Sequence, residues 1–144
     1  PSDMPDKFES GTPNLPGIIG LKASLDWLQK EGMENIEKRE RELGSMLLEG
    51  LKEIDTAVLY GKPTMEGRLS VFAVNFRDTD NGILADGLSA AGFETRPGLH
   101  CAPLAHKTLG SYPQGSLRVS PGYFNSPEDI GAFLEALRSC IRNY

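Results

Sequence analysis

Four stretches of the chain carry apolar residues at intervals of three and four positions, the spacing that places side chains on one face of an α-helix. The first stretch predicts a helix over 16–32 and the second a helix over 33–54. The third predicts a helix over 83–92, which ends at a glycine, and the fourth a helix over 127–141. A shorter helix is predicted over Pro103–Leu109, because it opens with a proline and precedes a glycine.

The helix over 127–141 has a start signal in three parts. Ser126 stands where a capping hydroxyl belongs, Pro127 takes the first helical position, and Asp129 is the acid three residues after the cap. Its apolar residues form one unbroken face, as docking on a sheet requires. They are Ile130, Phe133, Leu134, Leu137 and Ile141.

Strands are predicted in the remaining apolar stretches, at Ala57–Tyr60, 69–76, 93–96 and 116–120. The second of these is nearly continuous in apolar residues, which predicts a strand that is covered on much of both faces. The order of helices and strands favours an α/β fold of the α+β type. We expect a small mixed or antiparallel sheet with helices packed on it.

The 144 residues are 39% hydrophobic and 24% charged, the composition of one globular domain with a sizeable core. A formal net charge of −5 and a pI near 5.0 argue against a nucleic-acid partner, because phosphate binding draws on clustered Lys and Arg. No apolar run is long enough to cross a bilayer, so no membrane association is expected. The two cysteines and two histidines have no disulfide or zinc spacing, so we expect no metal site and a cytoplasmic location.

The loop 96–103 reads Arg-Pro-Gly-Leu-His-Cys-Ala-Pro and gathers a guanidinium, an imidazole and a thiol at a turn. A cysteine just before a helix, with cationic neighbours, favours the thiolate, which is the nucleophilic form. Cys101 is therefore a candidate reactive thiol. The alternative is a small buried hydrophobe, the common state of a lone cysteine. Cys140 lies beside Leu137 and Ile141 in a predicted helix, where packing explains it.

Three separated motifs resemble one protein family. The segment 8–14 reads Phe-Glu-Ser-Gly-Thr-Pro-Asn, and the loop 96–102 contains Arg-x-Gly-x-His-Cys-Ala. The segment 117–120 reads Leu-Arg-Val-Ser and is followed by Tyr-Phe-Asn at 123–125. In this order the motifs resemble the C-terminal part of a cysteine desulfurase, within the class V aminotransferase family of pyridoxal phosphate (PLP) enzymes. The short thiol loop is most similar to the group of SufS-like desulfurases and selenocysteine lyases.

The resemblance implies that PLP withdraws electrons from bound L-cysteine while an enzyme thiolate attacks the substrate sulfur, which leaves L-alanine and an enzyme-bound persulfide. Cys101 matches the nucleophile of this family. Arg118 matches the residue that holds the substrate carboxylate, a task for the two-pronged guanidinium, and Arg96 assists the substrate or the thiol loop. Thr12, which follows Gly11, matches a contact to the cofactor phosphate of the other subunit, and so implies a homodimer.

Each of these roles has an alternative in ordinary structure. Arg118 could pair with a surface carboxylate, and Gly11 and Thr12 could simply build a turn before a helix. His100 is a candidate accessory residue to which the motif assigns no role. The dipeptide 106–107 is His-Lys, which carries the Schiff base in this family. Here it follows the thiol loop instead of preceding the segment 8–14, so it is interpreted as ordinary surface.

The position of the Schiff-base lysine in the family sets the expected domain organisation. Residues 1–14 would enter from a large domain, and 15–144 would form the C-terminal small domain of a fold-type I PLP enzyme. The chain alone is expected to be inactive, and a sulfur-acceptor protein is an expected partner. Two alternatives remain: another class V aminotransferase or lyase in which Cys101 is incidental, and a free-standing sulfur-carrier or interaction module.

Overall fold

A computed structural model describes residues 2–9 and 11–142, and within these ranges the chain forms five helices and three strands. The elements are α1 (Leu15–Glu31), α2 (Met33–Lys52), β1 (Ala57–Tyr60), β2 (Phe72–Phe76), α3 (Asn81–Ala90), α4 (Pro103–Leu109), β3 (Leu117–Val119) and α5 (Pro127–Arg142). They belong to two compact units, residues 1–36 and 37–144. Helix α2 begins in the first unit and continues into the second.

The first unit contains α1, a regular helix that buries none of its residues. The Asn14 side chain caps its N-terminus by accepting a hydrogen bond from the Gly17 N–H at 3.1 Å. The predicted helix is confirmed, and its apolar stripe lies on the surface. Ile18, Leu21 and Leu25 are 57%, 61% and 50% exposed.

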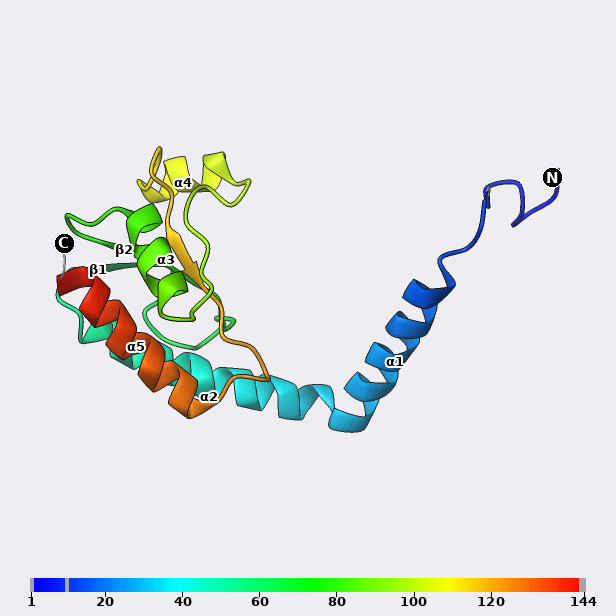
Figure 1. The fold of residues 1–144 in the computed structure, drawn as a ribbon, viewed down its shortest axis with the longest axis horizontal. Coiled ribbons are helices and arrows are strands. Elements are labelled where there is room, and N and C mark those ends of the chain that lie inside the picture. The colour runs from blue at the N-terminus through cyan, green and yellow to red at the C-terminus, as the bar shows by residue number, and fades with distance from the viewer. Residues whose placement is uncertain (1, 10, 143–144) are drawn as a thin grey trace. The chain divides into compact units, whose positions relative to one another are not determined.

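The second unit is built on an antiparallel sheet in the order β1-β2-β3. One face of this sheet is buried, because alternate residues of β2 and β3 join the side chains of α2, α3 and α5 in a single core. Figure 1 shows α2 and α5 side by side, with α4 away from them. The buried core consists of Leu43, Leu47, Leu48, Leu51, Phe72, Val74, Phe76, Leu84, Leu88, Leu117, Val119, Ile130, Phe133, Leu134 and Leu137.

Two glycines allow α5 to approach its neighbouring helices closely. A Cβ atom at Gly50 of α2 would overlap the side chain of Leu134, and one at Gly87 of α3 would lie 2.9 Å from Cys140 Sγ. This contact explains a glycine inside α3, where it costs about 1 kcal/mol relative to alanine. Cys140 is half-buried and packs against the core, as its position in the helix predicts.

The other face of the sheet carries a row of side chains that crosses all three strands. The register pairs Tyr60 with Ala73, and Ala73 with Arg118. Arg96 extends the row beyond β3, because it forms an isolated antiparallel bridge with Arg118. The two arginines are exposed. The sheet therefore has one face that builds the core and one that presents two neighbouring guanidinium groups.

Three predicted strands are shorter in the structure, and the one predicted over 116–120 is β3, Leu117–Val119. The strand predicted over 93–96 is reduced to an isolated bridge at Arg96. The strand predicted over 69–76 begins at Phe72. Among the described residues no strand pairs with 69–71, so Leu69 and Val71 are exposed and only one face of β2 is fully covered.

The predicted start of α5 is confirmed in detail. The Asp129 N–H donates to Ser126 Oγ at 3.1 Å, and the Ser126 N–H donates to Asp129 Oδ2 at 2.8 Å. This is a reciprocal capping box, with Pro127 as the first residue of the helix. The hydrogen bonds from Ser126 hold the pKa of Asp129 below its usual range.

Candidate functional site

The Cys101 thiol is exposed on a tightly turned loop before α4. His100 and Cys101 have φ angles of 50° and 60°, and Gly98 has a φ of 106°. A left-handed backbone costs a residue other than glycine about 1–2 kcal/mol, so two such residues in succession require support from surrounding contacts. Of these three residues, Gly98 is the one for which the sequence predicts a positive φ, because glycine alone adopts it without steric cost.

Backbone hydrogen bonds fasten this loop to β3. The Gly98 N–H donates to Ser116 O at 3.0 Å, and the Ser116 N–H donates to Gly98 O at 3.1 Å. Gly115 permits this approach, because a Cβ atom there would overlap the Gly98 carbonyl. The sequence does not predict the role of Gly115 and Ser116, because both act through backbone atoms. The one signal in the sequence is the glycine at 115, which in the structure has a φ of 80°.

Arg96 and Arg118 lie directly opposite each other at the edge of the sheet. The Arg118 N–H donates to Arg96 O at 2.8 Å, and the Arg96 N–H donates to Arg118 O at 3.2 Å. Residues that exchange both bonds project their side chains from the same face. Neither guanidinium belongs to an ion pair with any of the described residues. The structure thus brings the two predicted arginines together next to the thiol loop.

The prediction that residues 106–107 are ordinary surface is wrong for His106, which is buried, and holds only for Lys107. His106 Nδ1 is hydrogen-bonded to the Ser111 hydroxyl at 2.8 Å. The periodicity of a seven-residue helix is too short to reveal which side faces inward. The Lys107 Nζ lies 5.0 Å from the centre of the Tyr112 ring, a cation–π contact.

His100 belongs to the thiol loop and connects it to Ser116, the residue before β3. Its Nε2–H donates to Ser116 O at 3.0 Å, and its ring centroid lies 5.9 Å from that of His106. Burial lowers the pKa of His100, the bond to Ser116 opposes this, and the charges of Arg118, His106 and Arg96 lower it further. These effects favour the neutral imidazole, and the Ser116 carbonyl accepts the hydrogen bond that Nε2–H donates.

Thr12 and Gly11 lie in the first compact unit, whereas Cys101, Arg96 and Arg118 lie in the second. Thr12 is exposed, and Gly11 has a φ of 92° with open space where a side chain would be. An exposed hydroxyl beside an open glycine is chemically suited to a phosphate oxygen.

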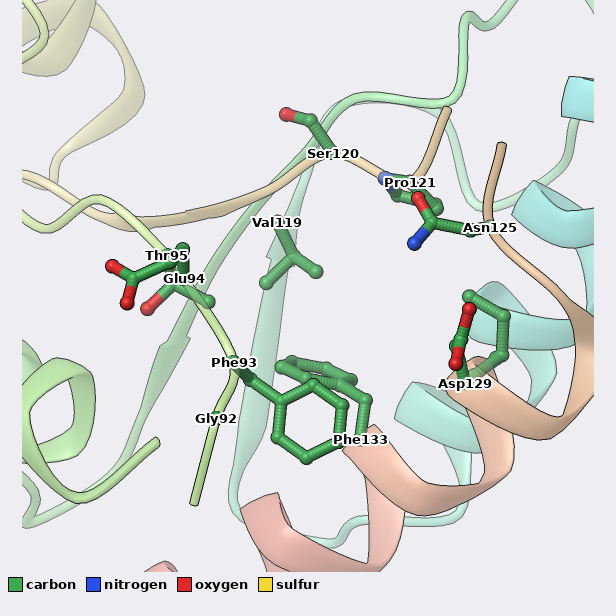
Figure 2. A pocket seen from close by; sticks show the side chains of 11 residues that line it. Gly92, Phe93, Glu94, Thr95, Val119, Ser120, Pro121, Asn125, Asp129 and Phe133 are labelled. Carbon is green, nitrogen blue, oxygen red and sulfur yellow. The ribbon is translucent and has the colours of Figure 1, made fainter. Parts of the chain in front are cut away.

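A cavity of about 330 Å³ lies on the core side of the same sheet edge (Figure 2). Its floor is formed by Phe93 and Phe133, whose rings meet edge to face at 5.6 Å, and by Val119. Thr95 and Val119 also line the cavity, but their neighbours Arg96 and Arg118 do not, and neither do His100 and Cys101. The cavity is therefore not lined by the predicted site residues.

Two features are absent from residues 2–9 and 11–142. No group of three or more His, Cys, Asp or Glu side chains in these ranges could hold a metal ion. Among the described helices, none combines the length and the apolar character that crossing a membrane requires. The candidate site contains the Cys101 thiol, the guanidinium groups of Arg96 and Arg118, and the imidazole of His100.

Comparisons of sequence place these features in a family. The model of the family "Aminotransferase class-V" matches residues 2–133. A probable cysteine desulfurase of Xylella fastidiosa (strain 9a5c) is 39% identical over 134 residues, which cover 92% of this chain and 31% of that protein. A probable cysteine desulfurase of Synechocystis sp. is 35% identical over 141 residues, which cover 97% of this chain and 33% of that protein.

Solved structures agree with these matches. The apo structure of the cysteine desulfurase of Thermococcus onnurineus NA1 superimposes with a TM-score of 0.87 and 31% identity, over 97% of this chain and 34% of that one. The cysteine desulfurase CsdA of Escherichia coli gives a TM-score of 0.84 and 27% identity, over 96% of this chain and 33% of that one. The chain spans about a third of the length of these relatives. It is a member of the class V aminotransferase family, similar over nearly its whole length to cysteine desulfurases.

Proposed function

We propose that the chain is the C-terminal part of a PLP-dependent cysteine desulfurase, and that it supplies both the thiol that receives sulfur and the groups that bind the substrate carboxylate. The observation that carries the proposal is the Arg96–Arg118 pair beside the Cys101 loop. Like charges directly opposite each other destabilise a sheet, so this pair is best explained by an anion that lies between them. L-cysteine combines that anion with a sulfur atom for the neighbouring thiol.

The two arginines bind the substrate carboxylate. A guanidinium holds a carboxylate with two parallel N–H···O bonds, each worth about 1.5–3 kcal/mol because both partners are charged. Arg118 stands on β3, whose backbone is fixed by its ladder with β2. A carboxylate bound there is held next to the loop that carries Cys101.

The Cys101 thiolate then attacks the sulfur of the bound cysteine, so that an S–S bond forms as the carbon–sulfur bond of the substrate breaks. The carbon keeps the electron pair of that bond, takes up a proton and leaves as alanine, while the sulfur stays on Cys101 as a persulfide. Because the thiol is exposed, its sulfur atom is accessible first to the substrate and afterwards to a sulfur-acceptor protein.

PLP, when bound, supplies the electron sink that cleavage of the carbon–sulfur bond requires. Thr12 would donate its hydroxyl to the phosphate, and its exposure beside the open Gly11 fits such a contact. The phosphate would belong to the other subunit of a homodimer. We assign the lysine that holds the cofactor to another part of the enzyme, so the chain alone is expected to be inactive.

Alanine formation from L-cysteine tests this function in the full-length enzyme. Cys101→Ala should abolish alanine and sulfide release, whereas the matched change Cys140→Ala should leave both within about twofold, because Cys140 packs between helices away from the loop. Unchanged desulfuration in Cys101→Ala would contradict the proposal. Retained transamination in that variant, with no sulfide from the wild type, would favour an aminotransferase in which the cysteine is incidental.

A further inference from the structure

We propose that His100 is a positioning residue that latches the Cys101 loop to the strand carrying Arg118, through the hydrogen bond from its Nε2–H to the carbonyl oxygen of Ser116. This inference rests on the proposed function, because it assigns the latch to the presentation of the sulfur-accepting thiol. His100 would act through Cys101 and would not itself react.

The Ser116 carbonyl is the centre of the latch. Its oxygen accepts two hydrogen bonds, one from the Gly98 N–H at 3.0 Å and one from His100 Nε2–H at 3.0 Å. A carbonyl oxygen has two lone pairs, so both are used. The two donors lie on either side of Leu99, and together they hold both ends of the turn against the strand.

The backbone of the loop requires such a restraint. His100 and Cys101 both have positive φ angles, a conformation that persists outside glycine only where surrounding contacts determine it. The Ala102 N–H closes the turn by donating to Leu99 O at 2.8 Å, but this bond lies within the loop. From residues 98–101, the Gly98–Ser116 pair and the His100 side chain are the described bonds that connect the turn to the strand.

The surroundings of His100 disfavour a second proton on its imidazole ring. With the proton on Nε2, Nδ1 is a bare acceptor, and it is buried with no hydrogen-bond partner among the described residues. A second proton would bury an unpaired N–H beside Arg96 and Arg118, whose charges oppose it. The buried His106, fixed by Ser111, lies beside the ring.

The latch couples the two functional groups of the site. Ser116 immediately precedes β3, and Arg118 is two residues further along that strand. A loop fastened to Ser116 therefore moves with Arg118. The thiol and the carboxylate-binding group then keep one spacing, as an attack on a bound substrate requires.

A pair of substitutions that differ by one methylene group tests the latch in the full-length enzyme. His100→Gln places an amide N–H near the position of Nε2, whereas His100→Asn places it near that of Nδ1, too short to reach Ser116 O. Asparagine tolerates positive φ better than glutamine does, so a purely conformational role would favour His100→Asn. A hydrogen-bonding role favours His100→Gln.

Two measurements read the outcome. In His100→Asn we expect amide exchange in peptides covering 97–102 and 114–118 to be about five- to tenfold faster, with exchange in 57–60 unchanged, because one net hydrogen bond is lost locally. We expect kcat for alanine formation to fall at least tenfold while KM for L-cysteine stays within twofold, because Arg118 is untouched. His100→Gln should recover most of both.

Any other result would contradict the proposal that His100 positions the Cys101 loop. Exchange and kcat at wild-type values in His100→Asn, or equal or better values than in His100→Gln, would show that the imidazole bond does not position the loop. A fall in kcat without faster exchange in those peptides would do the same. If the wild-type enzyme formed no alanine, the proposed function would fail on its own, while the exchange comparison would still decide whether His100 fastens the loop.

Discussion

Gly87→Ala tests whether Cys140 packs tightly between α3 and α5, in contrast to Cys101, whose thiol is exposed. A Cβ atom at Gly87 would lie 2.9 Å from Cys140 Sγ, inside the distance at which such atoms coexist, and 3.8 Å from Cys140 Cβ, an ordinary contact. The overlap therefore involves the sulfur atom alone. Its relief requires either rotation of the thiol or separation of α3 from α5.

Two opposing effects set the magnitude. Replacing a glycine inside a helix by alanine stabilises it by about 1 kcal/mol, and overpacking a core contact costs about 1–3 kcal/mol. In the wild-type background we expect a net loss of about 1 kcal/mol in the free energy of unfolding. In a Cys140→Ala background the sulfur is gone, so the same substitution should instead add up to about 1 kcal/mol.

Urea unfolding of the four proteins of this cycle measures the coupling, which we expect to be about 1–3 kcal/mol. Gly131→Ala is the matched control, because a Cβ atom at this glycine of α5 would meet nothing within 4 Å. That substitution should stabilise the chain in both backgrounds. Additive effects of Gly87→Ala and Cys140→Ala would refute the packing argument.

Three further predictions follow from the site and from the cap of α5. Arg118→Lys in the full-length enzyme should raise KM for L-cysteine by about 10- to 150-fold, because it removes a charged hydrogen bond worth about 1.5–3 kcal/mol. An unchanged KM in steady-state kinetics would show that Arg118 has a structural role and does not bind the substrate. Limiting iodoacetamide at neutral pH should label Cys101 well before Cys140, since only Cys101 is exposed, and peptide mapping that finds equal labelling would contradict this. The pKa of Asp129 is lowered in the folded chain, so its contribution to stability is present above the ordinary pKa of an aspartate and is lost as the pH falls through the lowered value. In acid titrations of unfolding, Asp129→Asn should therefore lose that part of the pH dependence. An unchanged profile would refute the assignment.

Features encoded by local residue choice were predictable from the sequence. The start of α5 is the best example, because Ser126 and Asp129 cap each other across a single turn and need no tertiary partner. The apolar spacing also located α1 but not its exposure, since periodicity identifies a face without saying what covers it. The motifs selected Arg96 and Arg118 one at a time, whereas their face-to-face pairing depends on the register of distant segments.

The conformation of the thiol loop could not be predicted from the types of its residues. The sequence placed Cys101 on an exposed turn, and the structure agrees. The left-handed backbone at His100, its hydrogen bond to the carbonyl oxygen of Ser116, and the burial of His106 arise from contacts between segments. Such contacts become visible only when the chain has folded.

The central claim is that Cys101 accepts sulfur from cysteine, and mass mapping of the full-length enzyme tests it most directly. The enzyme is mixed with L-cysteine without reductant, its remaining thiols are alkylated, and its peptides are weighed. The proposal predicts that the peptide containing Cys101 gains the mass of one sulfur atom in proportion to the alanine released, while the peptide containing Cys140 does not. Alanine release without added sulfur on Cys101, or with the sulfur on Cys140, would contradict the account.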